Sequence, residues 1–141
     1  MIKRFKHPDK KNAESIIAAS INQIKYTLKL KSTGESAFNI IRNIYECFRM
    51  LGDALLISRG IHSEDHIEQI IAIENLNLHT ARPIKLIDSL RRMRHNINYY
   101  GFLPKKQDSD DALSFAKLCF NQVVDAVKKE IEKNKGERRF L

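Results

Sequence analysis

Apolar side chains recur at steps of three and four residues along most of the chain, and glycine and proline are scarce. This period is typical of amphipathic helices that bury one face. Pro8 and Asp9 mark the expected start of a first helix, and Gly60 and Gly101 mark the ends of two others. The pattern predicts an all-α protein, an up-and-down bundle of four to five antiparallel helices.

Each expected helix has an apolar stripe. In chain order the stripes are Ala13, Ile17, Ile21, Ile24 and Leu28; Ala37, Ile41, Ile44, Phe48, Leu51 and Leu55; Ile67, Ile70, Ile71 and Leu76; Ile84, Ile87, Leu90, Met93 and Ile97; and Ala112, Ala116, Cys119, Val123, Val127 and Ile131. The first helix is expected to end near Lys31. The later helices are expected to begin at residues 32–35, at Ser63, around Thr80 and Pro83, and at Asp108 or Ser109.

A chain of 141 residues is long enough for one hydrophobic core. We expect a basic lead over residues 1–12, a helical domain over 13–133 and a frayed basic end over 134–141. No apolar run approaches the roughly 20 residues of a membrane span. No secretory signal is evident. Cys47 and Cys119 lie on apolar stripes, so a reducing cytoplasm is the simpler interpretation.

Most of the formal net charge of +8 comes from the two ends of the chain. Basic termini attract phosphate groups, and they also serve simply as solvated ends that aid solubility. The charge alone therefore leaves both interpretations open.

Residues 89–101 combine three arginines, one histidine, two asparagines and two tyrosines. At the helical period, Arg91, Arg94 or His95, and Asn98 form one strip beside the apolar stripe. Polar groups beside a buried stripe cost free energy unless they have partners. The strip therefore predicts a site.

Phosphate is the ligand expected at this strip, bound by Arg91, Arg94 and His95, with Asn98 and Tyr99 shaping the pocket. Tyr99 and its neighbour Tyr100 could also stack on a base or close the core.

Carboxylates of the second helix are expected to support the strip. Asp53 would pair with Arg91 or Arg94 and orient a guanidinium, with Glu46 on a similar face. Two alternatives stay open: the pair only sets helix register, or Asp53 faces solvent.

A metal, a cofactor or a catalytic triad is not expected. His62 and His66 are four residues apart but lack the order of the His-Glu-x-x-His zinc motif. The chain contains no Cys-x-x-Cys, no phosphate-binding glycine loop and no serine elbow. A nucleotide triphosphatase, a triad hydrolase and a redox enzyme are thus disfavoured.

Two motifs resemble those of small prokaryotic HEPN-domain proteins, and the resemblance extends over residues 13–132. The motifs are Tyr45-Glu46-Cys47-Phe48-Arg49 with Asp53-Ala54-Leu55-Leu56, Gly60 and His66, and the run from Leu90 to Gly101. The resemblance implies a bundle of four to five helices, often dimeric, that binds nucleotides. It also implies a minimal nucleotidyltransferase partner in a toxin–antitoxin-like pair.

Ribonuclease members of that family carry an arginine followed, four to six residues later, by a histidine. Here Tyr99 follows Arg94 at five residues, and no histidine lies downstream. The spacing of Arg94, Asn98 and Tyr99 is similar to that of another branch of the family. Members of that branch carry an arginine, any three residues and then Asp-Tyr, and in this chain Asn98 stands where they have the aspartate. The ribonuclease motif is therefore not intact, and enzymatic activity stays an open question.

The sequence thus predicts a cytoplasmic HEPN-type protein that binds nucleotide or RNA phosphate. We expect a homodimer, in which Gly52 would permit close approach. One alternative is a metal-independent endoribonuclease with Arg94 and His95 as catalytic residues, although a surface histidine is the commoner explanation of His95. The other alternative is a bundle that serves only protein assembly.

Overall fold

The computed structural model describes residues 3–76, 78 and 86–138. Within these residues the chain forms five helices and two three-residue strands, which confirms the all-α prediction. The elements are β1 (Lys3–Phe5), α1 (Lys10–Thr27), α2 (Ala37–Ser58), β2 (Ile61–Ser63), α3 (His66–Glu74), α4 (Leu86–Tyr100) and α5 (Lys106–Arg138).

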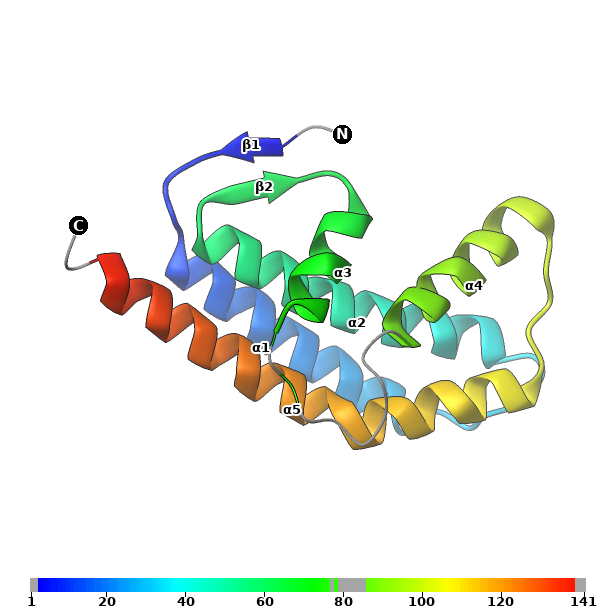
Figure 1. Cartoon of the computed structure of the whole chain (residues 1–141). Coiled ribbons are helices and arrows are strands. Elements are labelled where there is room, and N and C mark those ends of the chain that lie inside the picture. Colours follow the sequence, from blue (N-terminus) through cyan, green and yellow to red (C-terminus); the bar gives the residue numbers. More distant parts are fainter. Residues whose placement is uncertain (1–2, 77, 79–85, 139–141) are drawn as a thin grey trace.

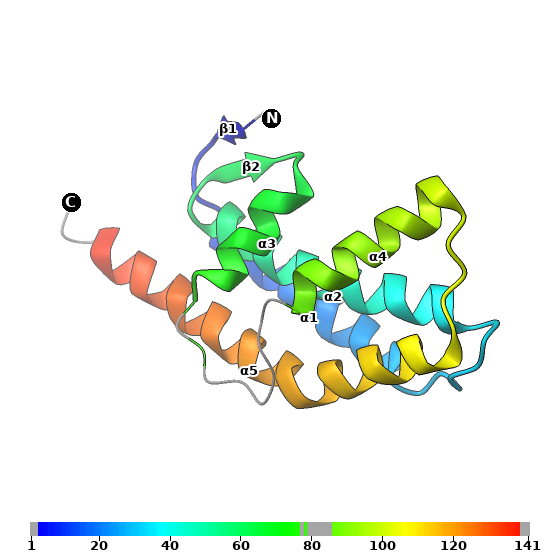
Figure 2. The same ribbon diagram turned by 45° about the vertical axis from the view of Figure 1, so that its right-hand side comes forward.

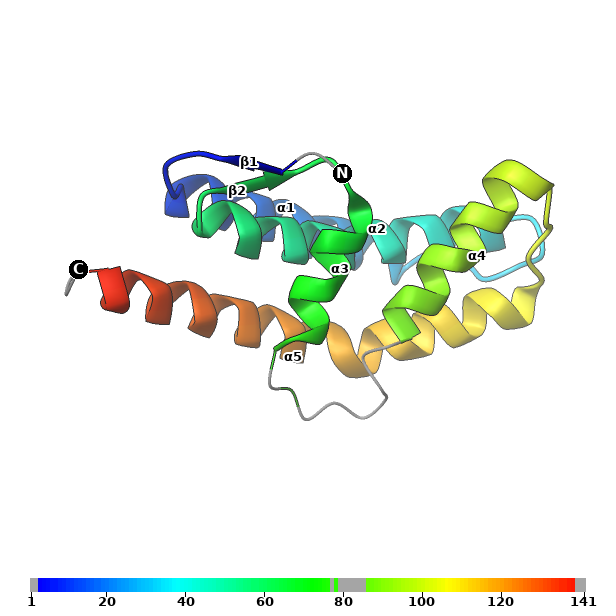
Figure 3. The same ribbon diagram turned by 45° about the horizontal axis from the view of Figure 1, so that its top comes forward.

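Helix α2 is the centre of the bundle, because α1, α3, α4 and α5 all pack against it. Figure 1 shows α1 antiparallel to α2, whereas α5 runs in the same direction as α2. The shorter helices α3 and α4 lie inclined across the long ones, as Figure 3 also shows. Both faces of α2 are therefore covered, and α2 contributes the largest share of the core residues, followed by α5.

The core follows the predicted stripes closely in α2 and α5. All six apolar residues predicted to face inward from α2 are buried, and so are the six predicted from α5. Phe48 contacts both Phe115, with ring centroids 5.1 Å apart, and Phe120, at 5.3 Å. Both cysteines are buried and free, and burial raises the pKa of the Cys47 thiol to about 12.

The start of α1 and the end of α2 follow their capping residues. The Asp9 carboxylate accepts a hydrogen bond from the Asn12 backbone N–H at 2.9 Å, as an N-cap residue does. After α2, Gly60 has φ of 80°, a conformation that favours glycine. The Gly60 carbonyl accepts from the Lys6 N–H at 2.7 Å, and β1 pairs antiparallel with β2. This small ribbon, whose strand β1 lies inside the expected basic lead, was not predicted.

The prediction for α3 was wrong in part. Asp65 caps this helix by accepting from the Ile67 N–H at 2.9 Å, and Ser63 belongs to β2. The side chains of Ile67 and Ile71 are 43% and 41% exposed, although both were expected inside. Only one narrow face of this short helix contacts α2, so Ile70 alone of the three expected isoleucines is buried.

The fourth helix is described from Leu86 onward, so its expected start around Thr80, Pro83 and Ile84 lies outside the described residues. Ile87 and Leu90 are buried as predicted. Met93 and Ile97 are only partly covered, because the C-terminal end of α4 projects away from the long helices (Figures 1 and 2).

Helix α5 begins at Lys106, earlier than the expected cap at Asp108 or Ser109. The Asp108 carboxylate, in the first turn of α5, accepts a hydrogen bond from the Lys105 backbone N–H at 2.8 Å. An N–H at the start of the helix, which has no partner within the helix, thus has a side-chain acceptor. Ser109 is buried, and its hydroxyl lies 2.5 Å from that of Ser32. The connection between α4 and α5 is therefore shorter than predicted.

Candidate functional site

Arg91 and its neighbour Arg92 are both held by one carboxylate of their own helix. Arg91 Nε donates to Asp88 Oδ1 at 2.9 Å, and Arg92 Nε lies 3.0 Å from Asp88 Oδ2. The Arg91 side chain is 27% exposed, whereas that of Arg92 is 73% exposed. Arg91 thus stays beside the bundle, and Arg92 extends into solvent.

Arg94 reaches across to α2. Its guanidinium carbon lies 5.6 Å from the centroid of the Tyr45 ring, within the range of a cation–π contact. Tyr45 is fully buried. The Nε atom of Arg94 is itself buried and has no hydrogen-bond partner among the described residues. Buried donors without an acceptor are rare in proteins, so this atom is the strongest indication of a binding site.

The remaining residues of the predicted strip lie on the exposed end of α4. The His95 ring packs against Tyr99, with centroids 4.6 Å apart, and lies 5.9 Å from Tyr100. His95, Asn98 and Tyr99 are all exposed. They belong to the last turns of α4, which project away from the long helices (Figure 2), whereas Arg94 is half-buried against α2.

A polar strip on α2 was largely missed from the sequence. Tyr45, Arg49 and Asp53 lie four residues apart, and Gln69 of α3 joins the strip. Arg49 donates through Nε to Glu46 Oε1 at 2.8 Å and through Nη1 to Gln69 Oε1 at 3.0 Å. Gln69 Nε2 in turn donates to Asp53 Oδ1 at 3.3 Å. The four-residue spacing was the available signal for Arg49, whereas nothing in the local sequence pointed to Gln69.

The predicted partner of Asp53 was therefore wrong. Its carboxylate accepts from Gln69, and the side chains whose charge lowers the pKa of Asp53 are Arg49 and His62, not Arg91 or Arg94. The reason is geometric: α3 covers this part of α2, whereas α4 crosses nearer to Tyr45.

The electrostatics of this region favour an anion near Tyr45. Burial raises the pKa of the Tyr45 phenol, and the positive charges of Arg94, Arg49 and Arg91 oppose that rise. Burial lowers the pKa of Arg49, but its hydrogen bond and charge interaction with Glu46 raise that pKa overall. The charges of three guanidinium groups thus act on one buried phenol; Arg49 is paired with Glu46 and Arg91 with Asp88, and the Arg94 guanidinium makes the cation–π contact with the ring.

A metal centre has no candidate in the part of the chain that the structure describes, where no three His, Cys, Asp or Glu side chains are grouped to hold an ion. The side chain of His66, considered above with His62, lies outside the described residues. None of the helices described has the length and apolar character to cross a membrane.

Comparison with family models, curated proteins and solved structures finds no match to this chain. The resemblance to HEPN-domain proteins therefore stays a prediction that depends on the quoted motifs.

Proposed function

We propose that this chain is a HEPN-type protein that binds the phosphate of a nucleotide or of RNA, with Arg94 as the principal phosphate-binding residue. The observation that carries the proposal is the buried Nε of Arg94, which lacks a hydrogen-bond acceptor. Leaving such a donor unsatisfied costs about 1–3 kcal/mol, and a phosphate oxygen would supply the acceptor. The Arg94 side chain as a whole is only half-buried, so part of it is in contact with solvent, and a phosphate oxygen would have to approach the buried Nε from that exposed part.

The surroundings of Arg94 support an anionic ligand. The Tyr45 ring makes a cation–π contact with the guanidinium of Arg94. Arg91 lies one turn earlier and adds positive charge, while Asp88 fixes its position. Arginine binds phosphate strongly because its planar fork of N–H groups matches two oxygens at once.

His95, Asn98 and Tyr99 have a secondary role in this proposal. They lie on the exposed end of α4, where the His95 and Tyr99 rings, tilted against each other, would offer an aromatic surface to a base. The HEPN resemblance adds two expectations: a cytoplasmic homodimer, and a minimal nucleotidyltransferase partner in a toxin–antitoxin-like pair.

Binding of ATP and of a fluorescent single-stranded RNA, measured by calorimetry and fluorescence anisotropy, tests the proposal. We expect Arg94→Ala to weaken binding at least about tenfold, because a charge-assisted hydrogen bond contributes about 1.5–3 kcal/mol. Arg92→Ala is the matched control, since it removes the same charge from an exposed position on the same helix. Its effect should be about threefold or less.

Incubation of total RNA with the protein in EDTA separates the alternatives. Cleavage that is lost in both Arg94→Ala and His95→Ala would establish the endoribonuclease instead. Equal weakening by Arg94→Ala and Arg92→Ala would show only general attraction to the basic chain. Absence of both binding and cleavage would leave protein assembly as the function and overturn the proposal.

A further inference from the structure

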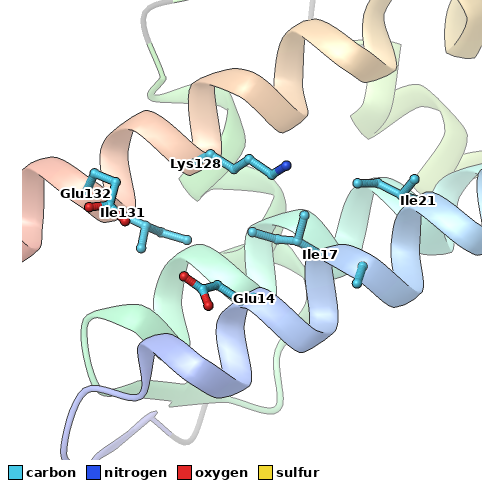
Figure 4. A pocket seen from close by; sticks show the side chains of 7 residues that line it. Glu14, Ile17, Ile21, Lys128, Ile131 and Glu132 are labelled. Atoms are coloured by element: carbon cyan, nitrogen blue, oxygen red, sulfur yellow. The ribbon is translucent and has the colours of Figure 1, made fainter.

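A groove of about 430 Å³ lies between α1 and α5, on a different pair of helices from the Arg94 region. It exists because both helices pack mainly against α2 rather than against each other. The α1 side of the groove is one helix face with the spacing of three and four residues. The lining residues, shown in Figure 4, are Glu14, Ile17, Ala18, Ile21, Lys128, Ile131 and Glu132.

The floor of this groove is apolar. Ile17 and Ile131 face each other across it, and Ile21 extends the apolar surface along α1 (Figure 4). Ala18 also lines the groove, and its single methyl group takes up little of the space. A concave apolar surface with a few polar groups at its edge is the usual form of a small-molecule site.

At one end of the groove, charged side chains of α1 and α5 contact each other. Lys10 of α1 forms an ion pair with Glu132 of α5 and lies 3.7 Å from Glu14. The single charge of Lys10 balances only one of these two carboxylates, so this end of the groove keeps a negative charge, and the Lys10–Glu132 pair connects the two helices there. A negative head group is therefore disfavoured at this end and would have to lie at the other, beside Lys128.

Lys128 provides the charge over the open part of the groove. Figure 4 shows its side chain extending from α5 toward Ile21, with the ammonium directed away from Glu132. Among the described residues, Lys128 has no ion-pair partner within 4.0 Å. A single cation above an apolar floor complements a molecule with an apolar body and one negative head.

We infer that this groove binds a small amphipathic anion, an alkyl carboxylate of medium length. The carboxylate would contact Lys128 Nζ, and the alkyl chain would lie over Ile17 and Ile131. The volume is within the range of about 300–1,000 Å³ typical of small-molecule clefts. From Glu14 to Ile21 the helix rises about 10 Å, at about 1.5 Å per residue, which suits a short chain better than a long lipid.

Octanoate is a suitable probe, titrated below its micelle concentration against protein with labelled isoleucine methyl groups. We expect saturable NMR shifts at Ile17, Ile21 and Ile131, with weaker binding of octanol and of octylammonium. Lys128→Met should weaken octanoate binding about fivefold. The control Lys129→Met removes a neighbouring charge that borders a different groove, and it should leave binding unchanged. Ala18→Leu should abolish binding by filling the space.

Several outcomes would overturn the inference. Octanol binding as tightly as octanoate would contradict the role of Lys128, as would equal effects of Lys128→Met and Lys129→Met. Shifts confined to other isoleucines would place the ligand elsewhere. Circular dichroism of Ala18→Leu checks that this exposed position tolerates the change. None of these results bears on Arg94, so this inference and the phosphate proposal can fail independently.

Discussion

The amide of Gln69 connects the two charged side chains of the α2 polar strip. Its oxygen accepts from Arg49 Nη1 at 3.0 Å, and its nitrogen donates to Asp53 Oδ1 at 3.3 Å. Because an amide offers both a donor and acceptors, one side chain can satisfy a cation and an anion together. Gln69 is itself buried, so loss of either hydrogen-bond partner would leave a buried polar group unpaired and would cost folding free energy.

Asp53→Asn is expected to raise the free energy of unfolding near pH 7. Burial raises the pKa of the Asp53 carboxyl, and Arg49 only partly offsets this. A carboxyl with a raised pKa contributes stability below its unfolded value of 3.8, and that contribution is lost as the pH rises through the folded value. The difference in the free energy of unfolding between the Asp53→Asn variant and the wild type should therefore become smaller as the pH falls toward 3.8.

Urea denaturation at several pH values measures this difference. Asp125→Asn is the control, because it makes the same chemical change at an exposed position, and it should alter the free energy of unfolding by no more than about 0.5 kcal/mol at pH 7. An Asp53→Asn variant that is less stable than the wild type at pH 7, with the gap closing in acid, would contradict the expectation.

At the scale of elements, the backbone of α3 approaches α2 closely at Gly52. A Cβ atom built on Gly52 would lie 2.1 Å from the backbone oxygen of Gln69, closer than any real contact. The sequence suggested that Gly52 permits close approach between two copies. The structure shows instead that it permits close approach of two helices in one chain, and it thereby places Gln69 beside Asp53.

Gly52→Ala should destabilise the protein by about 1–3 kcal/mol, because a backbone contact cannot move aside as a flexible side chain can. Alanine's higher helix propensity, worth about 1 kcal/mol, offsets only part of this cost. Thermal or chemical denaturation measures the change. Gly34→Ala is the matched control: nothing lies within 4 Å of its added Cβ, so we expect a change of no more than about 0.5 kcal/mol. Equal effects of the two substitutions would refute the argument.

At the scale of the whole molecule, the end of α4 and the loop after it expose large apolar side chains. Tyr99, Tyr100 and Leu103 are 73%, 77% and 83% exposed, and Phe102 is 45% exposed. Adjacent exposed residues of this size are typical of an interaction surface, whereas scattered single ones are not. This surface is where we expect the proposed homodimer to form.

Light scattering coupled to gel filtration should therefore report a mass of two chains. We expect Leu103→Glu to shift the protein to one chain, because it places a charge within the apolar surface. Leu118→Glu is the control, since Leu118 is a 46% exposed leucine on α5, away from this surface. A single-chain mass for the wild type would exclude the homodimer at the concentration measured.

Helical spacing along the sequence predicted only part of the candidate site. The helical spacing correctly indicated that Arg94 lies beside the buried stripe, but it also grouped Asn98 with Arg94. Arg94 is half-buried and contacts Tyr45, whereas Asn98 is exposed near the end of α4, which projects away from the long helices (Figure 2). Likewise, Asp53 was identified as a carboxylate that needs a partner, while its actual partner Gln69 belongs to another helix.

The sequence by itself determined the helical class, the faces that are buried in α2 and α5, and the residues at which α1 begins and α2 ends. These features depend on interactions between residues close in sequence, which the apolar period and the capping residues express. Only the tertiary structure decided that Arg94 lies over Tyr45, that Gln69 joins Arg49 to Asp53, and that α1 and α5 leave a groove. Such contacts depend on the angles at which helices cross, and no local pattern specifies them.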